Sequence, residues 1–315
     1  MKNCEKFPYN IFPPEEVVVN DEHLIVYRSM FNNLYTLYNY LNSDPVINNN
    51  AFSELESVTG SKSFAGKPYN VAVEDLIGDV DEKYNTFMKL QKDLVNTRKI
   101  NYTKYRTVRT IAGGRLNNQL YSAGSPLCYE TEEKIAEPKF VRIFVNLTYN
   151  CMTTRKQVIN RALVLLNVIK ALENASYLVD LNMFDLSSCF DELFYFVLKA
   201  KKYGNKINME MIYKTMCCTE FLRRVIFRLM ETMDFKIRWG YNGYGTPCDA
   251  YFIRSFLNLS KDDLVFPQPR DMHIGGTNIV SDFENALRYL RLNDKIDTKQ
   301  LVKELQKKNT ILQNR

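Results

Sequence analysis

The clearest pattern of hydrophobic and polar positions in this sequence lies between residues 141 and 181. Over residues 141–148 apolar and polar side chains alternate, and many are β-branched or aromatic, which predicts a β-strand. Apolar side chains then recur at helical spacing from Val158 to Leu172, on a stripe wide enough to pack against a sheet. A short apolar run at 177–181 predicts another strand. The segment therefore predicts a βαβ unit with two parallel strands.

The rest of the chain surrounds this unit with further helices and short strands. Helical spacing of apolar residues occurs in five segments, residues 23–41, 82–98, 189–202, 209–233 and 282–292. Further strands are expected at 235–239 and 264–266, and the acidic stretch 130–138 is interpreted as a connector. Strands and helices that alternate in this way favour an α/β fold class, a three-layer Rossmann-like sheet domain.

Three regions are expected along the chain. Residues 1–138 are punctuated by Pro and Gly and form a mixed, mainly helical N-terminal region. Residues 139–292 form the α/β sheet domain, and residues 293–315 form a polar C-terminal helix. That last helix has leucines on one side, so it either packs on its own domain or binds a partner.

Composition narrows the classes of protein. The chain has 315 residues, of which 45% are hydrophobic and 25% charged, so a disordered or fibrous chain is excluded. The net charge of +6 is mildly basic and compatible with a nucleic-acid partner. The first residues have no apolar run after the lysines, and no apolar run is long enough to cross a bilayer. We therefore expect no secretory signal and a soluble, intracellular protein with no membrane partner. Seven cysteines without a CxxC motif, beside two histidines, indicate reduced thiols and no metal site.

Polar residues gather where the first predicted strand ends. Side chains two residues apart share one face of a strand, so Asn146, Thr148 and Asn150 are expected to point together toward its C-terminal edge. Ligands of open α/β sheets bind just outside that edge, beside the following helix N-terminus. These three residues are therefore candidate ligand-binding residues. The alternative is that they only satisfy the turn and cap the helix.

The order of elements continues with a long helix, a second strand and a late Gly275-Gly276-Thr277 loop before the helix at 282. Together with the residues from Asn146 to Asn150, this order resembles the von Willebrand factor type A fold, in which an Asp-x-Ser-x-Ser strand end supplies a magnesium site. The resemblance implies a von Willebrand A-like sheet domain and adds Thr277 to the candidate ligand-binding residues. Because Asn146 stands where the family has Asp, we expect no resident cofactor, and Mg²⁺ is the one candidate.

A second resemblance rests on the order of four features. They are Ala112-Gly113-Gly114, Gly124-Ser125-Pro126-Leu127-Cys128, the strand at 141–148 and the pair Leu172-Glu173. This order is similar to that of uncharacterised proteins encoded by bacteriophages. The resemblance implies a phage origin, a viral protein, and localisation in the host cytoplasm.

A basic stretch runs from residue 98 to residue 115 without an acidic residue. Arginines and lysines interleaved with tyrosines can pair with phosphates and stack on unpaired bases. The candidate nucleic-acid-binding residues are Arg98, Lys99, Lys104, Arg106, Arg109 and Arg115. The alternative is a solvated basic face beside an acidic neighbour.

A Gly- and Tyr-rich loop follows residue 235 and holds the only tryptophan of the chain. Rigid aromatic side chains in such loops can recognise a partner, which makes Trp239, Tyr241 and Tyr244 candidate partner-binding residues. The alternative is a turn whose aromatic side chains complete the core.

These observations favour a non-enzymatic protein that binds another macromolecule, with a protein as the expected partner. Nucleic-acid binding through the basic stretch is one alternative. An enzyme that acts on a nucleotide or phosphate at the sheet edge is another, although no residue pattern assigns a nucleophile or a general base. The oligomeric state stays open.

Overall fold

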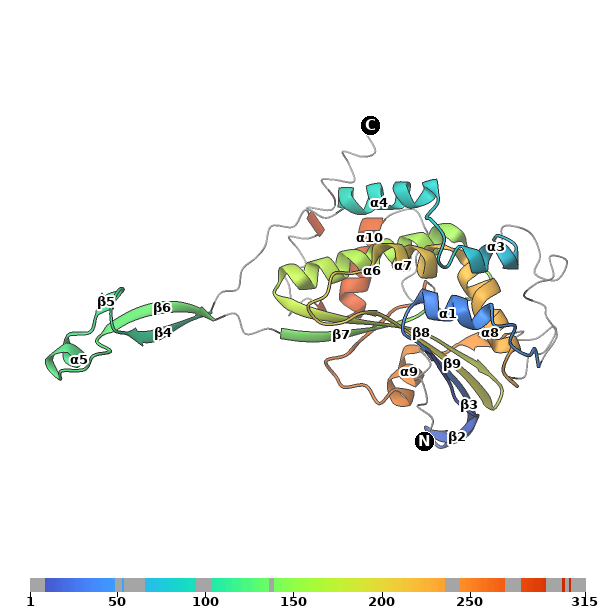
Figure 1. Cartoon of the computed structure of the whole chain (residues 1–315), viewed down its shortest axis with the longest axis horizontal. Helices are drawn as coiled ribbons and strands as arrows, with labels where there is room; N and C mark the ends of the chain where they lie inside the picture. The colour runs from blue at the N-terminus through green and yellow to red at the C-terminus, as the bar shows by residue number, and fades with distance from the viewer. Residues whose placement is uncertain are drawn as a thin grey trace.

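The computed structural model describes residues 9–48, 53, 66–94, 104–135, 139–235, 244–269, 279–292, 302–303 and 306. These residues form a body built on one mixed sheet and a small second sheet that stands apart from it (Figure 1). No helix within the described ranges is long and apolar enough to span a membrane. The expected α/β class is confirmed.

The large sheet is mixed. Its strands are β1 (Tyr9–Ile11), β2 (Glu15–Val19), β3 (Glu22–Phe31), β7 (Lys139–Asn146), β8 (Tyr177–Cys189), β9 (Glu192–Lys201), β10 (Thr246–Pro247) and β11 (Leu264–Phe266). The main order is β1-β3-β9-β8-β7-β11, with β2 beside β3 and β10 beside β8. Strand β7 runs parallel to both β8 and β11, whereas β9 returns antiparallel to β8. The expected βαβ unit and the strand at 264–266 are therefore confirmed.

Helix α6 (Arg155–Asn174) connects the two parallel strands. It begins with a capping box, in which Thr154 Oγ1 accepts from the Gln157 N–H and Gln157 Oε1 accepts from the Thr154 N–H. Nearly every residue from Val158 to Leu172 is buried. The helix is covered from both sides, because the sheet lies beneath it while α10 (Ile279–Tyr289) and α4 (Glu82–Leu94) lie above it (Figure 1).

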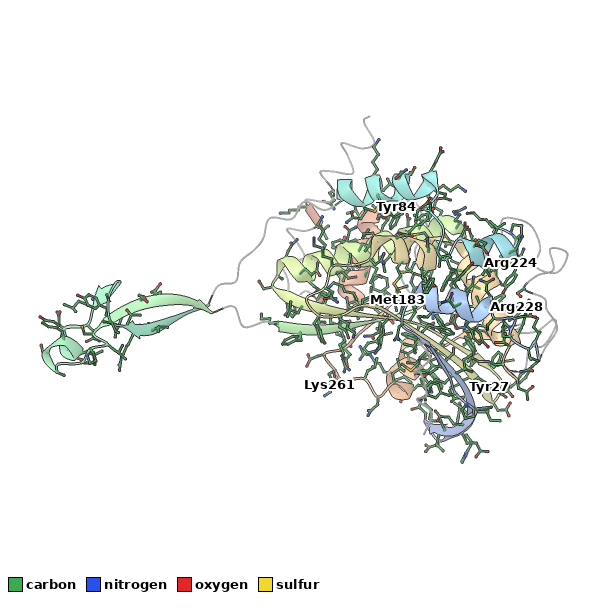
Figure 2. The ribbon with its side chains drawn as sticks, in the orientation of Figure 1. Tyr27, Tyr84, Met183, Arg224, Arg228 and Lys261 are labelled. Carbon is green, nitrogen blue, oxygen red and sulfur yellow. The ribbon has the colours of Figure 1, made fainter. Side chains whose placement is uncertain are left out.

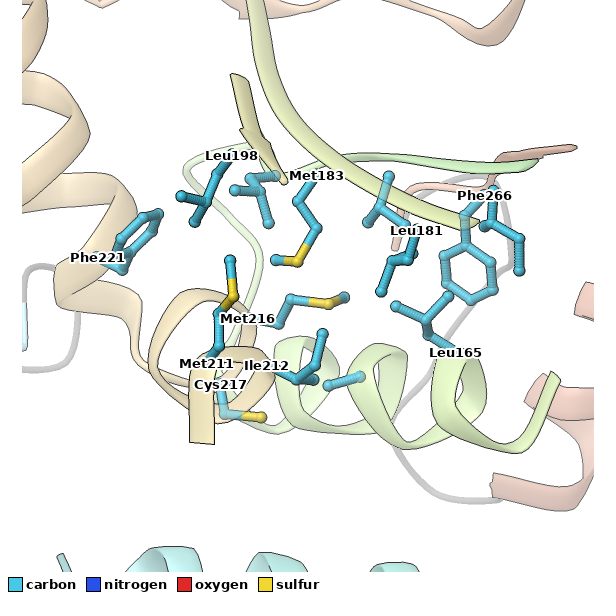
Figure 3. Close-up of a cluster of buried hydrophobic side chains, with 14 of the residues drawn as sticks. Leu165, Leu181, Met183, Leu198, Met211, Ile212, Met216, Cys217, Phe221 and Phe266 are labelled. Atoms are coloured by element: carbon cyan, nitrogen blue, oxygen red, sulfur yellow. The ribbon is translucent and has the colours of Figure 1, made fainter. Parts of the chain in front are cut away.

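The stretch expected as one helix over 209–233 is helical with a break. It consists of α7 (Met209–Ile212), the π-helical segments η1 (Tyr213–Cys217) and η2 (Phe221–Ile226), and α8 (Phe227–Glu231). The break falls at Cys218, whose backbone is extended. Sulfur atoms of methionines and of Cys217 gather between these helices, α6 and the sheet, which lets flexible side chains fill an irregular core (Figure 3).

The opposite face of the sheet has less cover. The short helix α9 (Ala250–Phe256) packs there over a second, smaller apolar cluster that includes Val26, Phe184 and Val265. Helices thus lie on both faces, in unequal numbers (Figure 1).

Two expected helices are strands instead. Residues 22–31 form β3, so the helix expected over 23–41 begins only at Leu34 as α1 (Leu34–Leu41). Residues 192–201 form β9, within the range expected as the helix 189–202. Both strands are paired on two sides and bury side chains on both faces, so their sequences lack the strict alternation of a half-buried strand. The mainly helical character expected of the N-terminal region is corrected accordingly.

The small sheet forms a protruding unit, called the arm here and defined as residues 104–135. It contains β4 (Lys104–Thr110), β5 (Arg115–Leu116), α5 (Asn118–Ser122) and β6 (Tyr129–Ile135), in the strand order β4-β6-β5. The connector expected over 130–138 is therefore wrong for residues 130–135, which belong to β6. Its acidic composition is typical of a connector, but the basic strand β4 pairs with it along its length.

The remaining helices and strands expected from the sequence agree with the structure in part. Helix α4 agrees with the helix expected over 82–98, α3 (Tyr69–Glu74) precedes it, and α10 agrees with the helix expected over 282–292. The strand expected at 235–239 and nearly all of the C-terminal helix 293–315 lie outside the described residues. The division of the chain at residues 138 and 292 stays a prediction. Strands β1, β2 and β3, which precede residue 138, belong to the large sheet.

Candidate functional site

Asn146 ends strand β7 with its side chain turned onto the neighbouring strand. Its Nδ2 donates to the Leu186 carbonyl at 3.1 Å, and its Oδ1 accepts from the Leu186 N–H at 3.1 Å. Oδ1 also accepts from the N–H of Thr148 at 3.2 Å and from Thr148 Oγ1 at 2.9 Å. The fully buried amide thus continues the ladder between β7 and β8, and its oxygen is already used three times by the protein itself.

A chain of hydroxyl groups leads from Thr148 to a buried acid. Thr148 Oγ1 lies 3.2 Å from Ser187 Oγ, which lies 2.7 Å from Asp185 Oδ1. Asp185 is fully buried, and its Oδ2 has no hydrogen-bond partner among the described residues. Burial raises the pKa of Asp185 to about 6, although the hydroxyls of Ser187 and Thr148 act in the opposite direction.

Burial and the neighbouring hydroxyls act on Asp185 in opposite directions. Ser187 Oγ donates to Asp185 Oδ1 and Thr148 Oγ1 donates to Asn146 Oδ1, so Ser187 stabilises the ionised acid whereas burial stabilises the neutral acid. Because desolvation is the larger cause, the pKa of Asp185 is raised overall.

Asn150 does not join this network. It is exposed, and its Oδ1 accepts from the Met152 N–H at 2.9 Å and from Cys151 Sγ at 3.3 Å, in the turn before α6. The structure therefore brings Asn146 and Thr148 together and leaves Asn150 in the turn. Thr277 lies outside the described residues.

The crevice beyond the end of β7 is filled from within. In a doubly wound sheet this crevice, between β7 and its neighbour β11, is where ligands enter. The buried Arg161 of α6 instead donates from NH2 to the Asn146 carbonyl and from Nε to the Pro267 carbonyl, both at 2.9 Å. Its guanidinium also lies over the Phe266 ring, 5.8 Å from the centroid.

Strand β10 closes the same edge from the side of β8. Its Thr246 and Pro247 pair antiparallel with Ser188 and Ser187, in the place that β7 leaves free after Asn146. Gly245 makes this approach with φ +93, and a Cβ there would lie 3.0 Å from the Ser188 carbonyl oxygen.

These residues do not form a magnesium site. The side-chain oxygens of Asn146 and Thr148 are turned onto the protein's own donors, and the nearest acid in the network is the buried Asp185. A hard cation needs carboxylate oxygens that face it, so this donor set does not fit Mg²⁺. No cluster of three or more His, Cys, Asp or Glu occurs in the part of the chain that the structure describes.

Sequence reasoning missed Asp185 and Arg161, although both left a signal. Asp185 is an acid inside an apolar strand, between Phe184 and Leu186, and Arg161 falls on the apolar stripe of α6 beside Ala162. A charge in a position that the pattern predicts to be buried indicates a buried polar network.

Tyr149, the residue after Thr148, offers a further buried polar group. Its hydroxyl has no hydrogen-bond partner among the described residues, and burial raises its pKa. The guanidinium of Arg223 on η2 lies over the Tyr149 ring at 5.2 Å and donates to the carbonyls of Cys151 and Thr153. Arg223 thus fastens the turn before α6 to the π-helical layer.

Tyr244 is the described member of the aromatic loop. Its ring stacks on Phe227 with centroids 3.8 Å apart and an interplanar angle of 6°, and its hydroxyl donates to Glu231 Oε1. Burial and the negative charge of Glu231 raise the pKa of Tyr244. The geometry fastens this end of the loop to the helical layer, while Trp239 and Tyr241 lie outside the described residues.

Glu231 is the centre of the polar network that holds Tyr244. It is fully buried and accepts from the N–H and the hydroxyl of Ser53 at 2.7 and 2.6 Å, and from Arg228 at 3.3 Å. Arg224 donates to the Ser53 carbonyl at 2.6 Å. Figure 2 shows Arg224 and Arg228 on the same side of the body, near α8, where this network joins the N-terminal part of the chain to the helices.

The candidate nucleic-acid-binding residues lie partly on the arm. Lys104 and Arg106 are in β4, Arg109 is exposed in the same strand, and Arg115 is exposed in β5. Strand β6 pairs Glu133 with Arg106 and sets Glu130 opposite both Arg109 and Arg115. The basic face therefore has an acidic neighbour, as the alternative interpretation expected, and nucleic-acid binding stays a prediction. Arg98 and Lys99 lie outside the described residues.

The end of the arm far from the body exposes apolar side chains. The exposed fractions are 73% for Ile111, 64% for Tyr121, 43% for Leu127 and 38% for Leu116. Figure 2 shows the arm's side chains at a distance from those of the body. Among the described side chains of the arm, Cys128 alone is buried, so this sheet has almost no core of its own.

Residues 15–295 match the model of a protein family described as a domain of unknown function, DUF7192. The chain belongs to this family. The match spans the large sheet from β2 onward, the helical layer and the arm, so all three are parts of one DUF7192 domain. Comparison with the curated proteins and with the solved structures produced no match.

Proposed function

We propose that this DUF7192 protein is a non-enzymatic binding module that engages a protein partner through the outer end of its arm. The observation that carries the proposal is the exposure of Ile111, Leu116, Tyr121 and Leu127 on a sheet that stands apart from the body. Apolar side chains gathered at an extremity of a protein mark an interaction site.

The size of the arm supports the proposal. Three short strands and one short helix bury a single described side chain, whereas a sheet of this kind ordinarily needs packing against another layer. A partner that covers the outer end would supply that layer. An aromatic residue such as Tyr121 also offers a large contact area at a low cost in conformational entropy.

The state of the sheet edge supports a non-enzymatic role. The polar groups expected to bind a ligand there, on Asn146 and Thr148, are bonded to Leu186, Ser187 and each other, and Arg161 and β10 occupy the crevice. Because the polar atoms of Asn146 and Thr148 are turned onto the protein, neither side chain is aimed at a substrate.

We further propose that the core is von Willebrand A-like and that the family is of phage origin, acting in the host cytoplasm. The parallel β7-α6-β8 unit and the order β9-β8-β7-β11 support the first point, because a doubly wound sheet places its first four strands in the order 3-2-1-4. The antiparallel β9 is a departure from an all-parallel sheet. The second point rests only on the order of sequence elements shared with phage proteins.

The test is affinity capture from cells in which the protein naturally occurs, with quantitative mass spectrometry of what is retained. The variants are Ile111→Asp and Tyr121→Ala in the arm. Matched controls are Val46→Asp, at a residue 78% exposed, and Tyr251→Ala, at a tyrosine 72% exposed on α9. We expect the arm variants to lose a defined set of proteins that both controls retain. Capture of the same set by all four variants would refute the proposal.

A further inference from the structure

Of the described strands at the margins of the two sheets, β4 with seven residues and β2 with five residues are the longest. Strand β2 pairs with β3 and has no second partner strand among the described residues. Strand β4 pairs with β6 and lies at the margin of the arm. Each therefore has a row of backbone N–H and C=O groups without a strand partner among the described residues, which is a template for pairing with another strand.

The two open strands carry opposite charge. Strand β2 starts with Glu15 and Glu16, both exposed, and Glu16 has the outward position on the strand. Strand β4 carries Lys104, Arg106 and Arg109, with no acidic residue. A strand that adds to the open side of β4 lies beside the same basic residues that β6 lies beside on the other side. In β6 the residues opposite Arg106 and Arg109 are acidic, Glu133 and Glu130.

Strand β2 also exposes apolar surface at its open edge. Val18 is 60% exposed, and Val17 beside it is half-buried. An exposed apolar side chain on an edge strand favours pairing with another strand, and here Val18 lies two residues from the exposed charge of Glu16. Pro13 and Pro14 protect only the stretch that precedes β2.

We propose that β4 of one molecule adds to the open edge of β2 of a second copy, in an antiparallel pair. This inference goes beyond the proposed function, because it uses the open edge of β4 and not the outer end of the arm. A register that sets Arg109 opposite Glu16 also sets Val108 opposite Val17 and Thr107 opposite Val18. Backbone hydrogen bonds then supply affinity, and the facing charges set direction and register.

The pair forms between molecules and not within one. Figure 1 shows the arm at the left end of the view and β2 at the lower edge of the body, well separated from the arm. The interface is head-to-tail, since each copy contributes a different strand to each of its two neighbours. Such an arrangement produces open chains or closed rings of molecules, the smallest ring being a dimer in which each copy adds β4 to β2 of the other.

The test is the mass of the full-length protein in solution, measured by sedimentation and light scattering over a range of protein concentrations and salt. We expect a reciprocal dimer or larger assemblies that dissociate as salt rises, because exposed charge pairs are screened. Glu16→Arg, which leaves the arm intact, and Arg109→Glu should each weaken association about tenfold. Glu82→Arg, the same charge change at an exposed residue of α4, is the control and should leave the mass unchanged.

Arg109→Glu could lower association by disturbing the arm itself, so a variant that exchanges the two charges provides a second test. The double variant Glu16→Arg/Arg109→Glu should recover association to within about threefold of the original, since the opposite charges again face each other. Mixing the two single variants should likewise produce joint assemblies from two poorly associating proteins.

Three outcomes overturn the inference: a monomer at every concentration, assemblies that Glu16→Arg leaves unaffected, or single variants that do not recover on exchange. Assembly on added single-stranded nucleic acid alone would overturn it in favour of the nucleic-acid alternative. If the protein is monomeric while Tyr121→Ala still loses captured proteins, this inference fails and the proposed function stands. If Ile111→Asp and Tyr121→Ala leave capture unchanged while Arg109→Glu weakens assembly, the proposed function fails and this inference stands.

Discussion

The side-chain amide of Asn146 takes the part of a backbone peptide toward Leu186, accepting from its N–H and donating to its carbonyl, both at 3.1 Å. Where β7 ends as a strand, this side chain extends its pairing with β8 by one residue. The arrangement requires an amide, because a carboxylate can accept from the Leu186 N–H but has no hydrogen for the Leu186 carbonyl.

Replacing Asn146 by Asp should therefore destabilise the protein. The new carboxylate would be fully buried beside the Leu186 carbonyl oxygen, and we expect a loss of about 3 kcal/mol of unfolding free energy in urea titrations at pH 7. Asn150→Asp is the matched control: that side chain is exposed and acts as an acceptor from Met152, so its effect should stay within about 0.5 kcal/mol. Equal effects of the two substitutions would contradict the role given to Asn146.

The buried acid predicts a specific pH dependence. The pKa of Asp185 is about 6 in the folded protein against 3.8 ordinarily, so the folded state holds the proton more tightly. This proton contributes about 3 kcal/mol to the free energy of unfolding. The contribution is fully present below about pH 4 and is lost as pH rises through 6. Asp185→Asn, which is neutral at every pH, should be more stable than the original protein at pH 7.5. The two proteins should have nearly equal stability near pH 4.

The measurement is the unfolding free energy of both proteins across pH 4–8. Ser187→Ala is an additional variant, because it removes a hydroxyl that lowers the pKa of Asp185 and should move the midpoint of the difference to higher pH. A difference between Asp185→Asn and the original protein that does not change with pH would exclude the titration.

Arg161 should be essential to the sheet edge that it fills. Arg161→Met keeps much of the apolar stem but leaves the carbonyls of Asn146 and Pro267 without this donor, and we expect a loss of about 2–4 kcal/mol. Lys156→Met, one turn earlier at an exposed position of α6, serves as the control and should change the stability by less than about 0.5 kcal/mol. Chemical denaturation decides the point, and an Arg161→Met protein as stable as the control would refute it.

Tyr244 tests whether an aromatic loop residue serves the fold or a partner. Tyr244→Phe keeps the stack on Phe227 and removes the hydrogen bond to Glu231, so we expect a loss of about 1–2 kcal/mol of stability with capture of partners unchanged. Thermal unfolding and affinity capture on the same preparations separate the two roles. Unchanged stability with lost capture would favour the partner-binding role predicted for this residue.

The local pattern of residues 141–181 was sufficient to predict two parallel strands and their crossover helix. Alternation from Val141 to Leu147 and the apolar stripe of α6 are properties of single elements, and each element must bury the face that the pattern marks. For β3 and β9 the same reasoning produced helices, because strands buried on both faces lose their alternation and only their neighbours reveal them.

At the candidate site, too, the pattern of single elements predicted where residues lie but not which groups they contact. The sequence placed Asn146 and Thr148 at the end of a strand, next to the N-terminus of α6, and both are there. Whether their polar atoms face a ligand or the protein depended on Leu186 and Ser187, forty residues away, and on Arg161 and β10, which close the crevice.

By itself, then, the sequence determined the α/β class, the central βαβ unit and the basic and acidic character of the strands now found in the arm. Only the tertiary structure decided that β4 and β6 pair in a separate sheet, that the polar atoms of Asn146 and Thr148 bond within the protein and that Asp185 is buried with a raised pKa. The reason is physical: periodicity records what one element buries, whereas hydrogen-bond partners and desolvation are set by residues that only folding brings near.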